Sequence, residues 1–287
     1  MNLYRYALAT AATTYLLLLV GGLVNPTGSS LACPDWPLCY GQVFPEMVGG
    51  VRFEHTHRLV ATLVGLLTIG LAGWIWRTRG ELRWFGVTAV VLVVVQGVLG
   101  GITVLLRLPL AVSAAHLALS MFFFAYLIYM CFRLRPGDPV WAWPRGGAAA
   151  WAGATAVAIY LQIFLGALVR HTGSGRACGL DWLLCQGRLL PSHGPLLLHM
   201  VHRFVGVAVA LVIVAASLRA YRAAGAAGSR FGVVLAGLAP MFVAAQIFLG
   251  AWTVKKRDQR RRGHRASRRR RPIVGRLRRA GVPPRRR

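Results

Sequence analysis

The sequence predicts an all-α protein that crosses a membrane several times, and three observations support this fold class. The 287 residues are 56% hydrophobic and only 14% charged, whereas about 25% of residues are charged in a typical soluble domain. The apolar residues form long runs, seven of which approach the roughly 20 residues that a helix needs to cross the hydrocarbon core. Motifs also recur in the same order along the chain, which indicates an internal repeat.

The seven apolar runs are expected to be membrane-spanning helices. In lipid, the backbone polar groups must be satisfied within the segment itself, and a helix does this with its own hydrogen bonds. The expected spans are residues 5–24, 56–76, 84–106, 111–132, 148–169, 198–218 and 231–254.

The net charge of +27 is distributed unevenly, because residues 255–287 carry 17 of the 34 basic residues and one acid, Asp258. This tail therefore holds +16, and the rest of the chain holds +11. The tail has low complexity, and we expect it to be disordered or to result from a shifted reading frame. The alternative is a genuine basic tail that binds anionic lipid headgroups or nucleic acid. Charge confined to one end gives little support for a nucleic-acid partner.

The arginines of the short loops predict the orientation of the spans. Basic residues gather on the cytoplasmic side of a membrane protein. Ten arginines lie before the first span or in the loops that would share its side, against five on the other side. The N-terminus is therefore predicted to be cytoplasmic, and loops 25–55 and 170–197 to be external.

Two pairs of cysteines lie in the two loops that are predicted to be external. Disulfides persist in oxidising compartments, so one local disulfide in each loop, Cys33–Cys39 and Cys178–Cys185, is the economical interpretation. Reduced thiols or metal ligands are the alternatives. Cys131, within the fourth span, is interpreted as a small buried apolar residue.

Two long segments of the chain match each other. VGGLVNPTGSSLACPDWPLCYGQ at 20–42 matches LGALVRHTGSGRACGLDWLLCQG at 165–187. The helices that follow correspond as well, with EHTHRLVATLVG at 54–65 and HMVHRFVGVAVA at 199–210. A match of this length and order indicates a structural repeat rather than shared composition.

The repeat divides the chain into halves 1–135 and 147–254, the first with four helices and the second with three. Four helices return the chain to its starting side, so the two copies are predicted to be parallel. His116 follows Gln96 by 20 residues, and the same offset from Gln246 falls in the basic tail. The eighth helix and its histidine are therefore missing, and residues 255–287 stand in their place.

Ionisable residues inside the predicted spans are the main candidates for function, because they are costly in lipid. Glu54 and His57 share one helix face, as do His199 and His202, which occupy the matching positions of the second half. His116 lies in AVSAAHLALS, where small neighbours allow a bulky group to approach. An interhelical hydrogen bond is the alternative role for any one of these histidines.

The residue types favour haem iron over other metals. The zinc-protease motif is absent because Phe53 precedes Glu54, and copper or di-iron sites would need more carboxylates, Met or Cys at depth. Paired imidazoles on facing helices of a bundle suit haem, with His57 and His116 as one pair. His202 would bind a second haem with a partner from the missing helix.

Arginines directly follow two of the candidate ligands. Arg58 and Arg203 are expected either to pair with haem propionates or to extend to the membrane surface. His55, His171 and His193 lie in or near loops and are expected to be surface residues.

Five segments together resemble the haem A synthase family: GGLVNPTGSSLACPDWPLCYGQ, EHTHR, AAHLALS, LVRHTGSGRACGLDW and HMVHRFVG. The resemblance covers about residues 5–254. It implies eight transmembrane helices in two halves, and oxidation of the C8 methyl of haem O to a formyl group, giving haem A for terminal oxidases. It also implies that one half holds the substrate haem and the other a haem b.

The resemblance assigns roles to individual residues. The iron ligands map to His57, His116 and His202, the acidic residue beside the substrate haem to Glu54, and the first cysteine pair to Cys33 and Cys39. A carboxylate one helical turn from a haem ligand is a plausible proton acceptor, although a carboxylate also stabilises the start of a helix by itself.

The expected protein is thus an oxidoreductase of the bacterial plasma membrane, surrounded by lipid. Haem O synthase and terminal-oxidase assembly are candidate partners, and a homo-oligomer is left open. Two alternatives remain: a non-catalytic b-type haem-binding membrane protein, or a truncated inactive product.

Overall fold

A computed structural model describes residues 2–136, 147–179, 181 and 183–277, without the side chains of residues 148, 149 and 256–277. The chain forms two compact units, Met1–His171 and Thr172–Arg287. Among the described residues, seven helices are long and apolar enough to cross a membrane. The predicted all-α polytopic fold with seven spans is therefore confirmed.

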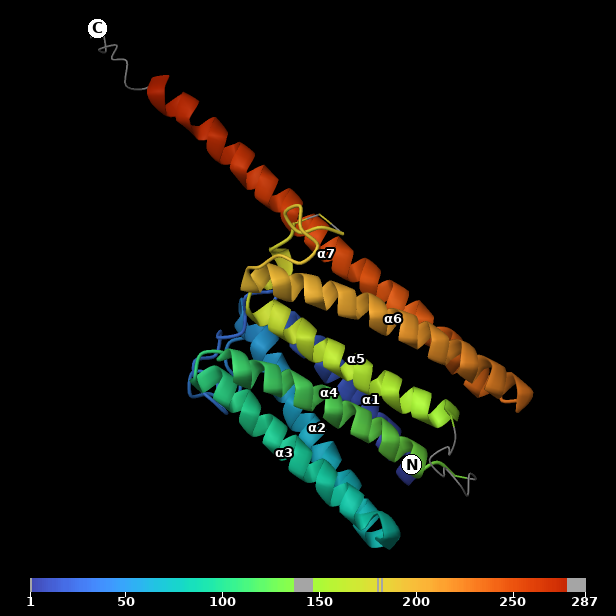
Figure 1. Cartoon of the computed structure of the whole chain (residues 1–287). Helices are drawn as coiled ribbons and strands as arrows, with labels where there is room; N and C mark the ends of the chain where they lie inside the picture. Colours follow the sequence, from blue (N-terminus) through green and yellow to red (C-terminus); the bar gives the residue numbers. More distant parts are fainter. Residues whose placement is uncertain (1, 137–146, 180, 182, 278–287) are drawn as a thin grey trace. The chain divides into compact units, whose positions relative to one another are not determined.

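The first unit is a ring of four helices with a fifth helix beside it. Neighbours in the ring are α1 with α2, α2 with α3, α3 with α4, and α4 with α1, so α2 and α4 lie at opposite corners. The helix α5 packs against α4, and the Tyr160 hydroxyl of α5 donates to the Ala118 carbonyl of α4 over 3.0 Å. The helices, which run side by side in Figure 1, are α1 Leu3–Val24, α2 Val51–Thr78, α3 Arg83–Leu105, α4 Leu110–Arg133 and α5 Gly147–His171.

The boundary between the units lies after α5, whereas the sequence repeat predicts that this helix opens the second half. The two divisions differ because the repeat is defined by sequence similarity, whereas the units are defined by which residues pack together. The predicted division of the chain at 135 and 147 therefore stays a prediction about the repeat.

The core of the first unit lies between the four helices of the ring. Small residues of α1, Ala7 and Ala11, are buried and allow close approach of the helices. The cluster continues with larger side chains, including Leu71, Phe123 and Leu127. Many other large apolar side chains point outward, as they do in helices that face lipid.

The long loops of the two units contain the same tight turn. Cys39 and Gln42 exchange backbone hydrogen bonds across Tyr40 and Gly41, which have φ values of 54° and 71°. Cys185 and Arg188 do the same across Gln186 and Gly187, at 54° and 80°. Two successive positive φ values are the mark of a type I′ turn. The second member must tolerate this conformation, and glycine does so without strain.

The second unit contains two long helices, α6 Gly194–Ala226 and α7 Arg230–Leu277, which pack against each other. A short 3₁₀ helix, η2 Ser174–Arg176, contacts α6, and another, η1 Gly80–Leu82, precedes α3 in the first unit. The apolar part of α7 is Arg230–Lys255, and the helix continues into the basic stretch as far as Leu277. This helical backbone differs from the disorder expected for the tail. Residues 278–287 lie outside the described residues, and the shifted frame stays a prediction.

Candidate functional site

His57 lies in the second turn of α2, at the end of the bundle where the long loop begins. Its imidazole rests on Gly21 of α1: a Cβ atom added there would lie 2.7 Å from His57 Cε1. The Nδ1 atom of His57 is buried and has no hydrogen-bond partner in the described part of the chain. The ring thus occupies a space that only glycine leaves open.

His116 lies in the second turn of α4 and has a corresponding environment. A Cβ atom on Gly100 of α3 would lie 3.0 Å from His116 Cε1. The amide nitrogen of Gln96, also on α3, donates to the His116 carbonyl over 3.0 Å and lies 3.3 Å from its ring Nε2. His116 Nδ1 is buried, and it has no partner among the residues described.

The two histidines therefore lie on helices at opposite corners of the ring, each against a glycine of an intervening helix. Buried imidazole nitrogens without partners, supplied by facing helices of a bundle, fit the axial ligation of haem iron. The donor set of the first unit is thus compatible with a haem, which would lie between α2 and α4.

Glu54 is buried one turn before His57, with 4% of its surface exposed. One carboxylate oxygen accepts from the Arg58 guanidinium over 2.6 Å, and the other accepts from the Cys33 backbone N–H over 2.9 Å. Glu54 and Arg58 therefore form an ion pair within α2, and both residues hydrogen-bond to the backbone of the disulfide loop. The sequence identified Glu54 and Arg58 as candidates, but it did not reveal this contact.

The disulfide loop itself is closed by Cys33–Cys39, and the loop of the second unit by Cys178–Cys185. A nitrogen of His55 and the sulfurs of Cys33 and Cys39 lie within 4.8 Å of one another. Because these sulfurs are bonded to each other, they are not thiolate ligands for a metal. The interpretation of local disulfides, rather than reduced thiols, is confirmed.

His55 corrects an expectation, because the sequence analysis placed it on the surface. Only 3% of its surface is exposed, and its Nε2 lies 2.8 Å from the Val43 carbonyl. The reason is that α2 begins at Val51, five residues before the expected span, so His55 lies inside the helix and beneath the loop. Of the other two histidines, His193 is exposed and His171 is partly buried.

Asp35 organises the tight turn of the first loop. Its carboxylate accepts the N–H groups of Gly41, over 2.8 Å, and of Tyr40, over 2.6 Å. These hydrogen bonds, with that from Gly41 having the largest effect, hold the pKa of the Asp35 carboxyl below its usual value of 3.8. The nearby charge of Arg58 acts in the same direction.

The second unit places His199, His202 and Arg203 on the first turns of α6. His199, which matches Glu54 in the repeat, is buried, and its Nε2 accepts from Arg203 Nε over 3.2 Å. Arg203 also donates to the backbone carbonyls of Asp181 and Gly179. His202 is partly buried on the same helix. The repeat-related Trp182 lies outside the described residues.

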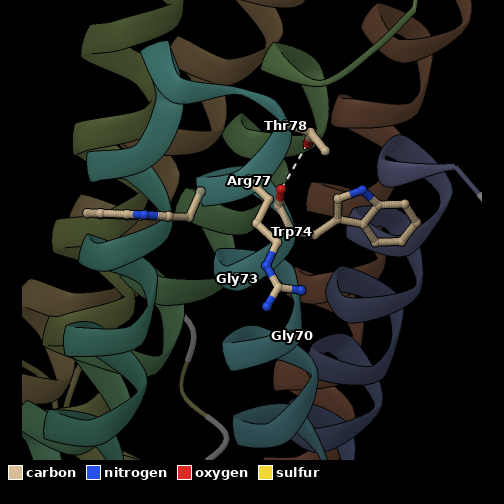
Figure 2. Close-up of a pocket in the computed structure, with 6 residues that line it drawn as sticks. Gly70, Gly73, Trp74, Arg77 and Thr78 are labelled. Atoms are coloured by element: carbon tan, nitrogen blue, oxygen red, sulfur yellow. Dashed lines mark hydrogen bonds between the residues drawn. The ribbon is translucent and has the colours of Figure 1, made fainter.

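A hollow of about 720 Å³ lies at the other end of α2, along Gly70, Gly73 and Trp74. In Figure 2, Arg77 and Thr78 border it, and the Thr78 hydroxyl donates to the Trp74 carbonyl over 2.8 Å. His57 is sixteen residues before Gly73, or about 24 Å along the helix at 1.5 Å per residue. The hollow is therefore distinct from the histidine site.

The sequence analysis missed the parts of the site that support the ligands. Gly21, Gly100 and Gln96 were visible only as members of the repeat, although each has a matching residue in the second half. Their contacts with His57 and His116 depend on helix packing, which the spacing of residues along one helix does not specify.

The fold and these contacts define a class: a polytopic helical membrane protein with a pair of partly buried imidazoles on helices at opposite corners of a bundle. Comparison with known proteins gives the family. The model of the COX15-CtaA family, described as cytochrome oxidase assembly protein, matches residues 4–48 and 51–257. The chain belongs to this family.

Curated relatives agree with this assignment. A protein named Heme A synthase from Symbiobacterium thermophilum is 34% identical over 222 residues, which covers 72% of each chain. Heme A synthase from Shouchella clausii is 32% identical over 267 residues, covering 88% of this chain and 87% of the relative. Heme A synthase from Geobacillus kaustophilus is 31% identical over 231 residues, covering 77% and 73%.

Proposed function

We propose that this protein is a haem A synthase, a membrane oxidoreductase that converts haem O to haem A. The observation that carries the proposal is the pair His57 and His116 in a chain of this family. Their rings pack on Gly21 and Gly100, and their buried Nδ1 atoms have no partner among the described residues. Oxidation of the C8 methyl of haem O to a formyl group is the reaction that this name implies. The chemistry at iron is supplied by the haem when it is bound.

The residues of this chain would bind and orient the haems. We assign His57 and His116 as iron ligands for the substrate haem of the first half, and His202 as a ligand for a haem b in the second half. The glycines beneath the first two rings and the Gln96 amide fix the position of these imidazoles. Ligands that are held rigidly in this way keep a reacting group in one geometry.

Glu54 is assigned as the group that accepts a proton near the substrate haem. It lies one turn from His57 and is shielded from solvent, where a carboxylate acts on a nearby group with little competition from water. Arg58 and Arg203 are assigned to the propionates. For Arg58 this contact is a minor one, because four of its five N–H groups have partners and only the Nε–H remains for a propionate.

The surroundings of the protein follow from the same proposal. We place it in the bacterial plasma membrane with its N-terminus in the cytoplasm, as the arginines of the short loops favour. Haem O is its proposed substrate. Haem O synthase and the machinery that assembles terminal oxidases are its proposed partners.

The test is expression in a bacterial host that makes haem O but lacks a haem A synthase of its own. Haems are extracted from purified membranes and separated by chromatography. Haem A is expected from the unaltered chain and not from His116→Ala, while His193→Ala, an exposed histidine, serves as the matched control. Bound haem B without haem A would support a non-catalytic b-type haem protein instead. Absence of bound haem would support an inactive product.

A further inference from the structure

Arg58 makes more contacts than a haem-binding arginine needs. One terminal nitrogen donates to the carbonyls of Asp35, over 2.7 Å, and Leu38. The other donates to Glu54 over 2.6 Å and to the Cys33 carbonyl over 3.3 Å. Four of its five N–H groups are thus directed to the disulfide loop and to Glu54. Only 12% of the Arg58 side chain is exposed.

Glu54 completes a closed set of hydrogen bonds. Its second oxygen accepts from the Cys33 N–H, while the Cys33 carbonyl accepts from Arg58. Charge-assisted hydrogen bonds are the strong ones, and a guanidinium presents them in a fixed planar geometry. The carboxylate, the guanidinium and the first cysteine of the loop therefore move as one body.

The loop that Arg58 holds also reaches the other side of the bundle. A Cβ atom on Gly101 of α3 would lie 2.6 Å from Cδ2 of Trp36, so the indole lies directly on that glycine. The preceding residue, Gly100, is the one on which His116 rests. The loop thus connects the helix that carries His57 to the helix that supports His116.

The second unit repeats the loop contacts without the acid. Arg203 donates to the carbonyls of Asp181 and of Gly179, the latter over 3.4 Å. In place of a carboxylate, its Nε donates to His199. The feature shared by both units is an arginine that binds the backbone of a disulfide loop, and the ion pair is particular to the first.

We propose that Arg58 is a positioning residue: it fixes the Cys33–Cys39 loop to the start of α2 and thereby holds Glu54 in place, and Arg203 fixes the Cys178–Cys185 loop in the same way. The effect on turnover rests on the proposed function, because it assumes that Glu54 acts on haem O. The effect on the loops does not depend on it.

The first test measures how firmly each loop is held. In a Cys131→Ala background, membranes are treated with dithiothreitol for increasing times, which reduces a disulfide to two thiols and becomes a cyclic disulfide. The new thiols are alkylated, and peptides from the two loops are quantified separately. Arg58→Gln is expected to speed the reduction of Cys33–Cys39 about tenfold or more, since hydrogen bonds from a charged group are lost. Cys178–Cys185 should be unaffected.

Two matched variants make the first test specific. Arg203→Gln should speed only the reduction of Cys178–Cys185, and Arg52→Gln, an exposed arginine of the same helix, should change neither. If Arg58→Gln does not accumulate, Arg58→Lys replaces it; its ammonium keeps a charge near Glu54 but cannot reach four acceptors. Unchanged reduction rates in the variants at 58 would overturn the proposal.

The second test separates positioning from haem binding. For the active enzyme, Arg58→Gln should lower kcat about tenfold with little change in KM for haem O or in the haem bound per protein. The double variant E54Q/R58Q should be no slower than the slower single variant, because both act through one unit. A raised KM and a loss of haem at unchanged kcat would show that Arg58 acts only through its propionate contact and would contradict the positioning role. If the unaltered chain makes no haem A, the proposed function fails, and the alkylation result still decides the role of Arg58 in the loop.

Discussion

The two disulfide loops share their architecture and differ in one contact. Each contains a local disulfide followed by a type I′ turn, and each is bound through backbone carbonyls by an arginine of the following helix. Glu54 is the partner of this arginine in the first unit, and neutral His199 is the partner in the second. The shared part therefore builds the loop. The carboxylate is the addition in the first unit, and the proposed proton transfer depends on it.

A second difference concerns the glycines. Gly100 of α3 supports His116, whereas a Cβ atom on its repeat counterpart, Gly250 of α7, would meet nothing within 4 Å. Gln96 contacts His116, and its counterpart Gln246 is exposed. Among the described residues, the second unit therefore keeps the counterparts of Gly100 and Gln96, but no histidine packs against them. The four predictions that follow test how far the two halves differ.

The largest effect is expected from the histidines themselves. His116→Ala or His57→Ala should reduce haem A formation more than about 100-fold, because a proposed iron ligand for the substrate haem is lost. His202→Ala should instead remove haem from the second half and leave substrate haem bound in the first. Haem content and optical spectra of the purified variants measure this. Equal loss of both haems in every variant would show that the halves do not bind haem separately.

The next effect concerns the buried ion pair. Glu54→Gln leaves Arg58 without a counter-charge in a shielded position, and removing one partner of such a pair costs about 3 kcal/mol. His199→Gln replaces one neutral hydrogen-bond partner by another and should cost about 1 kcal/mol or less. Thermal unfolding in detergent compares the two variants. The comparison breaks down if His199→Gln is as destabilising as Glu54→Gln.

A smaller effect is expected when Gly21, the glycine against which His57 packs, is replaced by alanine. The Cβ atom of Gly21→Ala would lie 2.7 Å from the imidazole, so the ring must shift, and haem A formation should fall about tenfold. Gly22→Ala is the matched control, because its Cβ atom would meet nothing within 4 Å. Haem bound per protein and haem A yield are measured for both. Equal yields would show that the ring has room to move.

The smallest effect is a dependence of the first loop on pH. The folded pKa of Asp35 is lowered, so its stabilising contribution is complete above the usual carboxyl pKa of 3.8 and is lost as the pH falls through the lowered value. Hydrogen exchange of the Tyr40 and Gly41 amides, corrected for intrinsic rates, should accelerate below that pH. Asp35→Asn should show faster exchange already at neutral pH and no further change in acid.

The spans could be predicted from the sequence because hydrophobicity and length determine them. All seven expected spans begin within five residues of the helix starts, and the largest difference, five residues at α2, placed His55 outside its helix. The repeat identified His57 through its counterpart His202, and the place of His116 inside an apolar span identified the other candidate. These features are local, so each can be read from a continuous stretch of residues.

The contacts of the site could not be predicted in the same way. Arg58 lies 20 to 25 residues along the chain from the loop carbonyls that it binds. From the sequence alone, we expect it either to pair with a haem propionate or to extend to the membrane surface. The contact of His57 with Gly21 joins α2 to α1, and the contact of His116 with Gly100 joins α4 to α3. Such contacts depend on the rotation of each helix about its axis, which is determined by packing across the bundle.

The glycines beneath the histidines have a genetic consequence. A glycine codon becomes an alanine codon through one base change, and at Gly21 or Gly100 that change introduces a methyl group against an imidazole. Natural variants that impair the first half can therefore leave the codon of every proposed ligand intact. A survey of alleles in this gene that inspects only histidines and acids would classify such variants as harmless, although they alter the two positions where the ligands rest.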